Sequence, residues 1–271
     1  MDAAARHQWQ AATNDWLMWI NSGAVSRHTV QLRRYQLTRA AGAMPCGPWE
    51  ITPEHLQAWL SRQEWSPETR RSYLAALRSF FGWAHAHGLM VTDPSRLLRK
   101  VKSTKGRPRP ATERTVDRAL GRADTRQHLM IMLASRHGLR RGEICQVNTG
   151  DVVEDLDGWS LEVHGKGDKT RVVPLNDDVA RVLRAMPAGW VFPNGLGGHL
   201  SAAHTGKLMV RAMQHEATAH QLRHRFATRA YQGSLDILNV QRLLGHENVA
   251  TTQIYARPAE SEMRNVMRWA A

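Results

Sequence analysis

A cation-rich segment from Lys100 to Pro110 divides the 271-residue chain into two halves. Its sequence, KVKSTKGRPRP, contains five cations, two prolines, one glycine and no acidic residue. Proline and glycine interrupt regular structure, so this composition predicts a linker. We therefore expect a domain at residues 1–98, a basic linker at 99–111 and a second domain at 112–271, each with its own core.

The overall charge favours a polyanionic partner. The chain has a formal net charge of +13 and a pI of about 10.7. Nucleic acid and anionic membrane surfaces are the usual partners of such a chain. No run approaches 18 apolar residues, and the first ten residues lack the apolar stretch of a signal peptide, so we expect no membrane association. DNA or RNA is favoured, and the linker is interpreted as a basic strap across a phosphate backbone, with a solvated hinge as the alternative.

The two cysteines, Cys46 and Cys145, are isolated in the sequence. They have no metal-binding CxxC spacing, and two thiols make no disulfide framework. We expect a reducing compartment, the cytoplasm, and no structural metal.

The first domain is predicted to be helical. Helices are expected from about Ala3 to Ile20 and after the capping residues Ser26, Thr52 and Ser66. The last of these helices has apolar residues at helical spacing, namely Tyr73, Leu74, Leu77, Phe80, Phe81 and Ala84, and ends at Gly88. Seven of the ten tryptophans lie between Trp9 and Trp83, and core packing is favoured for them over stacking on bases.

The second domain is predicted to mix helices with a small sheet. Strands at Trp159–His164 and Thr170–Leu175 form a hairpin around a glycine-containing turn at 165–168. Helices are expected at 112–123 and 128–137 and from about Asp177, Ser201, His220, Leu235 and Ala250. The predicted fold is therefore mainly α with a small β-sheet in two domains, one helical and one α+β.

Four segments carry residues that suit phosphate chemistry. In the first, Glu143 follows Arg140 by three residues and would orient it on a helix, the alternative being a surface ion pair. In the second, Lys166 at the hairpin tip is either a mobile cationic arm or simply solvated. The third and fourth are the strings HQLRHRFAT, from His220 to Thr228, and LLGHENVATTQIY, which ends at Tyr255.

These segments, in this order and spacing, resemble the tyrosine recombinase family, the phage-integrase or Xer-like enzymes. HxLRHxxAT followed by LLGHxxxxTTxxY is highly specific, and the resemblance is strongest from Gly138 to Arg257. The positions that match the family's catalytic set are Arg140, Lys166, His220, Arg223, His246 and Tyr255, with Glu143 at an acidic supporting position.

The resemblance implies an enzyme that cuts and rejoins DNA through a covalent phosphotyrosine at Tyr255. A phenol is about one part in a thousand ionised at pH 7, so positive surroundings and a base must activate it. Arg140 and Arg223 would hold the non-bridging oxygens, and Lys166, with Lys169 as a rival, would protonate the leaving 5′-oxygen. No cofactor, ATP or metal is expected, since the chain has no GxxxxGK[ST] loop and the guanidinium groups replace a metal.

The family also implies how DNA is held. Two domains would close as a C-shaped clamp on double-stranded DNA carrying core-type sites. Predicted DNA contacts are Arg33, Arg34, Arg70, Arg71, Arg78, Lys102, Lys105 and Arg107. The tail from Met263 to Ala271 has apolar residues at helical spacing and would dock on a neighbouring protomer in a homotetramer, with docking in cis as the alternative.

Several functions remain open within this chemistry. Integration of a phage or mobile element is favoured because the N-terminal half is divergent and tryptophan-rich. The alternatives are an Xer-type dimer resolvase, a relaxase of the type IB topoisomerase kind, and a non-catalytic DNA-binding regulator. The complete catalytic set argues against the regulator.

Overall fold

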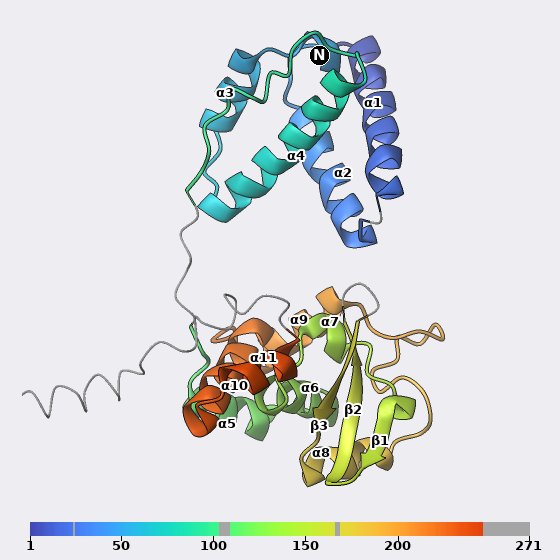
Figure 1. Ribbon diagram of the computed structural model, residues 1–271, viewed down its shortest axis with the longest axis vertical. Coiled ribbons are helices and arrows are strands. Elements are labelled where there is room, and N and C mark those ends of the chain that lie inside the picture. The colour runs from blue at the N-terminus through green and yellow to red at the C-terminus, as the bar shows by residue number, and fades with distance from the viewer. Residues whose placement is uncertain (24, 103–108, 166–168, 246–271) are drawn as a thin grey trace, which may run out of the picture. The chain divides into compact units, whose positions relative to one another are not determined.

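The computed structural model describes residues 1–23, 25–102, 109–165 and 169–245. The chain forms two compact units, Met1–Lys105 and Gly106–Ala271 (Figure 1), and the division falls within the predicted linker. None of the described helices is long and apolar enough to span a bilayer.

The first unit is entirely helical in its described part. Its helices are α1 (Ala3–Ser22), α2 (Arg27–Ala41), the short 3-10 turn η1 (Pro48–Glu50), α3 (Pro53–Ser61) and α4 (Pro67–Ala86). The predicted caps are confirmed, because the side chains of Ser26, Thr52 and Ser66 each accept a hydrogen bond from a backbone N–H in the first turn. Helix α1 continues two residues beyond the predicted end at Ile20.

Aromatic side chains fill the core of this unit. The Trp9 ring stacks on Phe80 at a centroid distance of 5.5 Å, and Trp16 meets the same ring edge-on at 5.6 Å. Trp59 and Trp83 are also buried, whereas Trp19 is 46% exposed. The prediction that most of these tryptophans pack in the core is therefore confirmed.

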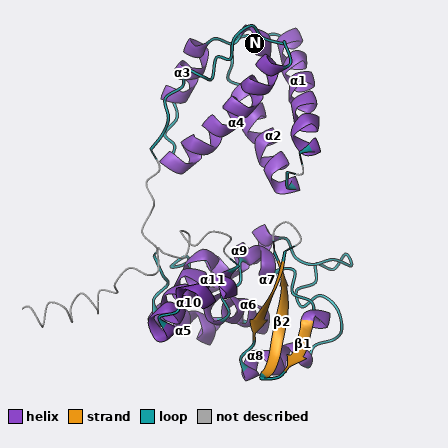
Figure 2. Ribbon diagram, in the orientation of Figure 1, coloured by secondary structure: helices purple, strands orange, loops and turns teal. Residues whose placement is uncertain are grey.

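The second unit combines helices with one antiparallel sheet of strand order β1-β2-β3 (Figure 2). Its elements are α5 (Glu113–Arg122), α6 (Thr125–Arg136), α7 (Arg141–Ile144), η2 (Thr149–Asp151), β1 (Val152–Asp155), β2 (Gly158–His164), β3 (Thr170–Pro174), α8 (Asp177–Arg184), α9 (Ala202–Ala212), α10 (Ala219–Ser234) and α11 (Ile237–Leu244). Strand β1 was not predicted, because its four residues, VVED, show no alternation of apolar and polar side chains. The helix predicted from Ala250 lies outside the described residues. The mainly helical class with a small sheet is confirmed.

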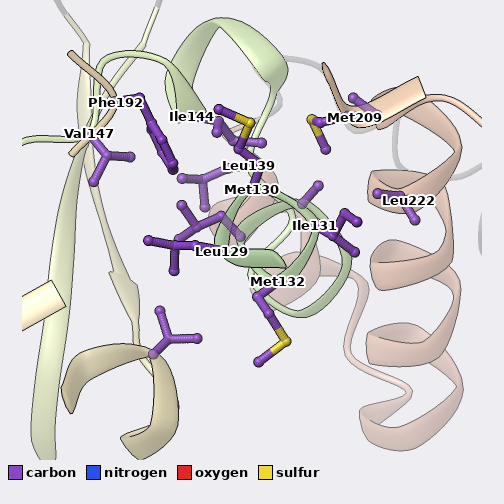
Figure 3. Packing of buried hydrophobic residues seen from close by; sticks show 14 of the residues in the cluster. Leu129, Met130, Ile131, Met132, Leu139, Ile144, Val147, Phe192, Met209 and Leu222 are labelled. Carbon is purple, nitrogen blue, oxygen red and sulfur yellow. The ribbon is translucent and has the colours of Figure 1, made fainter. Parts of the chain in front are cut away.

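Helix α6 is the centre of the second unit. All its residues from Leu129 to Ser135 are buried, as expected of a helix covered on every side. Figure 3 shows its side chains between the sheet on one side and α10, with Leu222, on the other. The segment after α6 leads into Gly138 and Arg140, and α10 carries His220 and Arg223. Packing of α10 on α6 thus brings these segments of the predicted site together.

Candidate active site

Arg140 lies at the start of α7 and not within a helix. Its backbone is extended, at φ −74° and ψ 151°, and it is the N-cap residue. The two oxygens of Glu143 accept hydrogen bonds from the Arg140 backbone N–H (2.8 Å) and from Nη1 of its side chain (2.6 Å). The prediction that Glu143 orients Arg140 is therefore correct in its result, although a capping turn and not a shared helix face achieves it.

Glu143 is a buried carboxylate that lies within ion-pair distance of three arginines. Its side chain is only 5% exposed, so the alternative of a surface ion pair is wrong. Nη1 and Nη2 of Arg171 donate to its two oxygens at 2.9 and 2.8 Å, and Nη1 of Arg223 lies 3.7 Å away. Burial raises the pKa of Glu143, but the hydrogen bonds and charge of Arg171, followed by those of Arg140, hold the pKa below its ordinary value.

Arg223 is buried beside this cluster. Its Nη1 donates to the Gly138 carbonyl at 2.6 Å, and its Nη2 donates to the Leu244 carbonyl at 2.5 Å. Nη2 of Arg140 donates to the next carbonyl, that of Gly245, at 3.1 Å. Both predicted arginines therefore converge on the C-terminal end of α11, where His246 is the next residue in the sequence.

His220 lies exposed in the first turn of α10, at the mouth of the same site. Partial desolvation, then the charges of Arg223 and Arg140, lower the pKa of His220. Its ring contacts that of His224 at a centroid distance of 4.0 Å. Desolvation, then His220 and Arg223, lowers the pKa of His224 to about 4. Both imidazoles are thus predominantly neutral at pH 7.

A pocket of about 970 Å³ opens between α7, α9 and the N-terminal end of α10. Arg140, His220 and Arg223 form part of its lining, and none of the described residues that line it is acidic. The lining also includes three exposed cations, Arg141, Lys207 and Arg211, which make no ion pair within the described ranges. The α10 N-terminus adds a favourable dipole. This combination suits a ligand with several phosphate groups.

Sequence reasoning missed four basic residues here. Lys207 and Arg211, spaced i and i+4, show a helical basic face that periodicity alone would have found. Arg141 and Arg171 carry no such signal, because each is one basic residue among many in a chain of this charge.

Five predicted site residues lie outside the described residues, namely Lys166, His246, Tyr255, Lys105 and Arg107. Their roles stay predictions. Lys169, the rival to Lys166, is exposed at the start of the β3 side of the hairpin.

Four of the predicted DNA contacts in the first unit make hydrogen bonds within the protein. Arg33 donates to the Ser72 carbonyl, Arg70 to those of Leu60 and Gln63, Arg78 to that of Leu98, and Arg34 to the Asn14 side chain. Arg33 and Arg70 tie α2 to α4 and the end of α3 to α4, so part of their role is to hold this unit together. Arg71 and Lys102 are exposed. DNA contact by this set stays a prediction.

Helices and a small sheet bring Arg140, Arg223 and His220 to one cationic pocket, with the carboxylate of Glu143 buried behind Arg140, and this arrangement suits a protein that binds phosphate. The chain matches the phage integrase family over residues 111–262. Tyrosine recombinase XerD of Rhizobium meliloti is 29% identical, over 82% of this chain and 81% of its own length. Tyrosine recombinase XerC of Xanthomonas campestris is 33% identical, over 76% of this chain and 66% of its own length. In fold, the chain is similar to a lambda integrase tetramer bound to a Holliday junction, with a TM-score of 0.72, 20% identity and coverage of 88% and 77%. The chain belongs to the phage integrase family and is a tyrosine recombinase.

Proposed function

We propose that this chain is a site-specific DNA recombinase that acts through a 3′-phosphotyrosyl intermediate on Tyr255. The observation that carries the proposal is the convergence of Arg140 and Arg223 at one cationic pocket around the buried Glu143. Two guanidinium forks at one place suit the non-bridging oxygens of a single phosphodiester. Each matches, in sequence, a position of the set that also contains Tyr255.

The reaction exchanges one phosphoester for another. The Tyr255 oxygen attacks phosphorus, the bond from phosphorus to the 5′-oxygen breaks, and that oxygen takes a proton from Lys166. Arg140 and Arg223 stabilise the charge that develops on the non-bridging oxygens, and His246 hydrogen-bonds the phosphate. His220, being neutral at pH 7, can accept the phenol proton directly or through water. A 5′-hydroxyl from a second strand then reverses these steps, so the bond energy is kept and neither ATP nor a metal is required.

The biological role is proposed as integration of a phage or mobile element. The tryptophan content that first favoured integration reflects core packing and so adds little support. The names of the XerC and XerD relatives favour the alternative, an Xer-type dimer resolvase, slightly. Both roles use the same cleavage, and the DNA sequence at which the protein becomes attached separates them.

Assembly on DNA is part of the same proposal. We propose that the two units clamp double-stranded DNA with core-type sites in the bacterial cytoplasm, and that four protomers act together. The fold's likeness to a lambda integrase tetramer on a Holliday junction supports this arrangement. The segment Met263–Ala271 would dock on the neighbouring protomer. If its deletion leaves cooperative synapsis of two duplexes unchanged, the docking role is wrong.

Covalent trapping tests the function directly. The wild-type chain and Tyr255→Phe are expressed in bacteria that carry candidate element DNA, the lysate is denatured, and DNA that stays attached is sequenced. Attachment by wild type alone at one locus is the expected result. Tyr231→Phe, on α10 of the same unit, is the matched control and should attach as wild type does.

The other results each point elsewhere. Attachment by both wild type and Tyr255→Phe would show that another residue is the nucleophile. Attachment scattered over many sequences would favour the topoisomerase-like alternative. Tight DNA binding without attachment by any variant would favour the regulator.

A further inference from the structure

Arg171 is a third arginine at the site, and the cleavage steps above give it no part. It lies on β3 with a side chain that is 13% exposed. Its Nη1 and Nη2 donate to Glu143, and its Nε donates to the Leu243 carbonyl at 2.8 Å. All three of its nitrogens therefore face protein acceptors, so Arg171 is poorly placed to bind a phosphate itself.

The carboxylate of Glu143 is shared between two arginines. Oε1 accepts from Nη1 of both Arg140 and Arg171, while Oε2 accepts from the Arg140 backbone and from Nη2 of Arg171. A fork on both oxygens fixes the plane of the carboxylate. By fixing this plane, Arg171 also fixes the direction in which Glu143 accepts the hydrogen bond from the Arg140 guanidinium.

Arg171 also supports the end of α11. Besides the bond to Leu243, its guanidinium lies directly under Gly245, where an added Cβ would stand 3.1 Å from Nη1 of Arg171. Gly245 has φ +60° and caps the helix. This same C-terminal end supplies the carbonyls that hold Arg140 and Arg223. One side chain thus joins β3, α7 and α11.

We propose that Arg171 is a positioning residue that aligns Arg140 and the end of α11 for phosphate binding, acting through Glu143 and the Leu243 carbonyl. This inference rests on the proposed cleavage reaction. It predicts that losing Arg171 slows cleavage while DNA binding is largely kept, because the binding cations of the pocket remain.

Arg225 provides a matched control. It is also an arginine with a 13% exposed side chain in the same unit, and it forks onto a carboxylate, Glu113, and donates to a carbonyl, that of Ser135. It does not line the pocket. Its carboxylate partner is 53% exposed, whereas Glu143 is 5% exposed, so the free energy of unfolding is measured for both Arg225→Gln and Arg171→Gln. Arg225→Gln then shows what the loss of an arginine–carboxylate pair away from the pocket does to cleavage.

The assay uses a synthetic duplex with the sequence recovered by covalent trapping, at saturating concentration in a single turnover. Arg171→Gln should form the covalent complex about 10- to 100-fold more slowly than wild type, the usual effect of losing a supporting partner. The Kd measured by fluorescence anisotropy should change by less than about threefold, since phosphate contacts dominate affinity. Arg171→Lys keeps the positive charge but lacks the fork, so its rate of covalent-complex formation should fall between those of wild type and Arg171→Gln. If Arg171→Gln does not fold, the rate of Arg171→Lys tests the positioning role instead.

The pH profile separates positioning from general destabilisation. The charged groups that face Glu143 are Arg140 before α7, Arg171 on β3 and Arg223 on α10. Burial raises the pKa of Glu143, and Arg171 is the main group that lowers it. Without Arg171 the pKa of Glu143 should therefore rise, and protonation of Glu143 in acid would break its ion pair with Arg140. The cleavage rate of Arg171→Gln should therefore fall more steeply from pH 7 to pH 5 than that of wild type or Arg225→Gln.

The results separate the inference from the function on which it rests. If wild type cleaves and Arg171→Gln cleaves as fast as Arg225→Gln, with parallel pH profiles, the positioning role is wrong and the recombinase function stands. If Arg171→Gln loses DNA affinity in proportion to its rate, Arg171 acts in binding and the proposal is again overturned. If wild type forms no covalent complex with the duplex, both the function and the inference fail.

Discussion

Gly138 lies against the ring of Phe226, so closely that a Cβ on Gly138 would stand 2.7 Å from Cε1 of that ring. Gly138 also has φ +69°, a conformation that costs other residues free energy. Its carbonyl accepts the 2.6 Å bond from Arg223. A single glycine therefore allows the turn after α6 to approach α10 and hold an arginine of the site.

Gly138→Ala should lower the free energy of unfolding by about 2–4 kcal/mol, from the left-handed backbone and the overlap with Phe226 together. It should also slow covalent-complex formation, because the Gly138 carbonyl can no longer hold Arg223 in place. Gly195→Ala is the control, since Gly195 has φ +76° in the same unit with no atom within 4 Å of an added Cβ. Urea denaturation should show a cost of only about 1–2 kcal/mol for that control. Equal losses in the two variants would show that the contact with Phe226 is unimportant.

Glu143→Gln removes the charge that three arginines share. It should lower the free energy of unfolding by about 3 kcal/mol, because buried arginines lose their counter-ion, and slow cleavage by about 10- to 100-fold. The control is Glu113→Gln, whose partners are Arg225 and Arg229 but whose side chain is 53% exposed. That change should cost about 1 kcal/mol or less and leave the cleavage rate unchanged. A normal cleavage rate in Glu143→Gln would remove Glu143 from the site.

The pH dependence of the Glu143 contribution follows from its depressed pKa. The folded pKa lies below the unfolded value, so the stabilisation is complete above about pH 4.3 and is lost as pH falls through the folded pKa. The stability difference between wild type and Glu143→Gln should thus be constant from pH 5 to pH 8 and shrink below pH 4. A difference that instead shrinks between pH 7 and pH 5 would mean that the Glu143 pKa is raised.

His224 should make the protein sensitive to mild acid. Its pKa is about 4 when folded, against 6.5 ordinarily, so the unfolded chain binds more protons between these values. Stability from this group is complete above about pH 6.5 and falls progressively toward pH 4. Thermal denaturation from pH 7 to pH 4.5 should show a smaller decrease in Tm for His224→Asn than for wild type. His204→Asn, an exposed position on α9, should follow wild type, and identical slopes in all three would place the acid sensitivity elsewhere.

Features that depend on neighbouring residues could be predicted from the sequence, whereas features that depend on contacts between distant segments could not. The helix starts at Ser26, Thr52 and Ser66 could be predicted because each cap is a hydrogen bond to a backbone N–H only three residues away. The predicted catalytic positions Arg140, His220 and Arg223 come from a specific motif, and the structure places all three in the lining of one pocket. Burial of Glu143 could not be predicted, since its partner Arg171 lies 28 residues away, and its burial depends on how β3 and α10 pack. Strand β1 was not predicted because it is defined by its antiparallel pairing with β2, and its own four residues carry no strand pattern.

The three exposed cations Arg141, Lys207 and Arg211 should contribute to DNA affinity through phosphate contacts. If the protein neutralises about eight phosphates in all, log K should fall with log salt at a slope of roughly −7, and replacing Lys207 or Arg211 by Gln should reduce that slope by about one each.

Arg136→Gln is the control, because Arg136 is a half-exposed arginine of the same unit that already pairs with Asp178 at 3.0 Å, away from the pocket. Titrations of a labelled duplex by anisotropy between 50 and 300 mM salt, roughly the range over which counterion release is measurable, give the slopes. Since counterion release counts contacts and not net charge, equal slopes for Lys207→Gln and Arg136→Gln would mean that DNA does not enter this side of the pocket. A change confined to the Lys207 and Arg211 variants would extend the DNA path from the arginines of the site along α9.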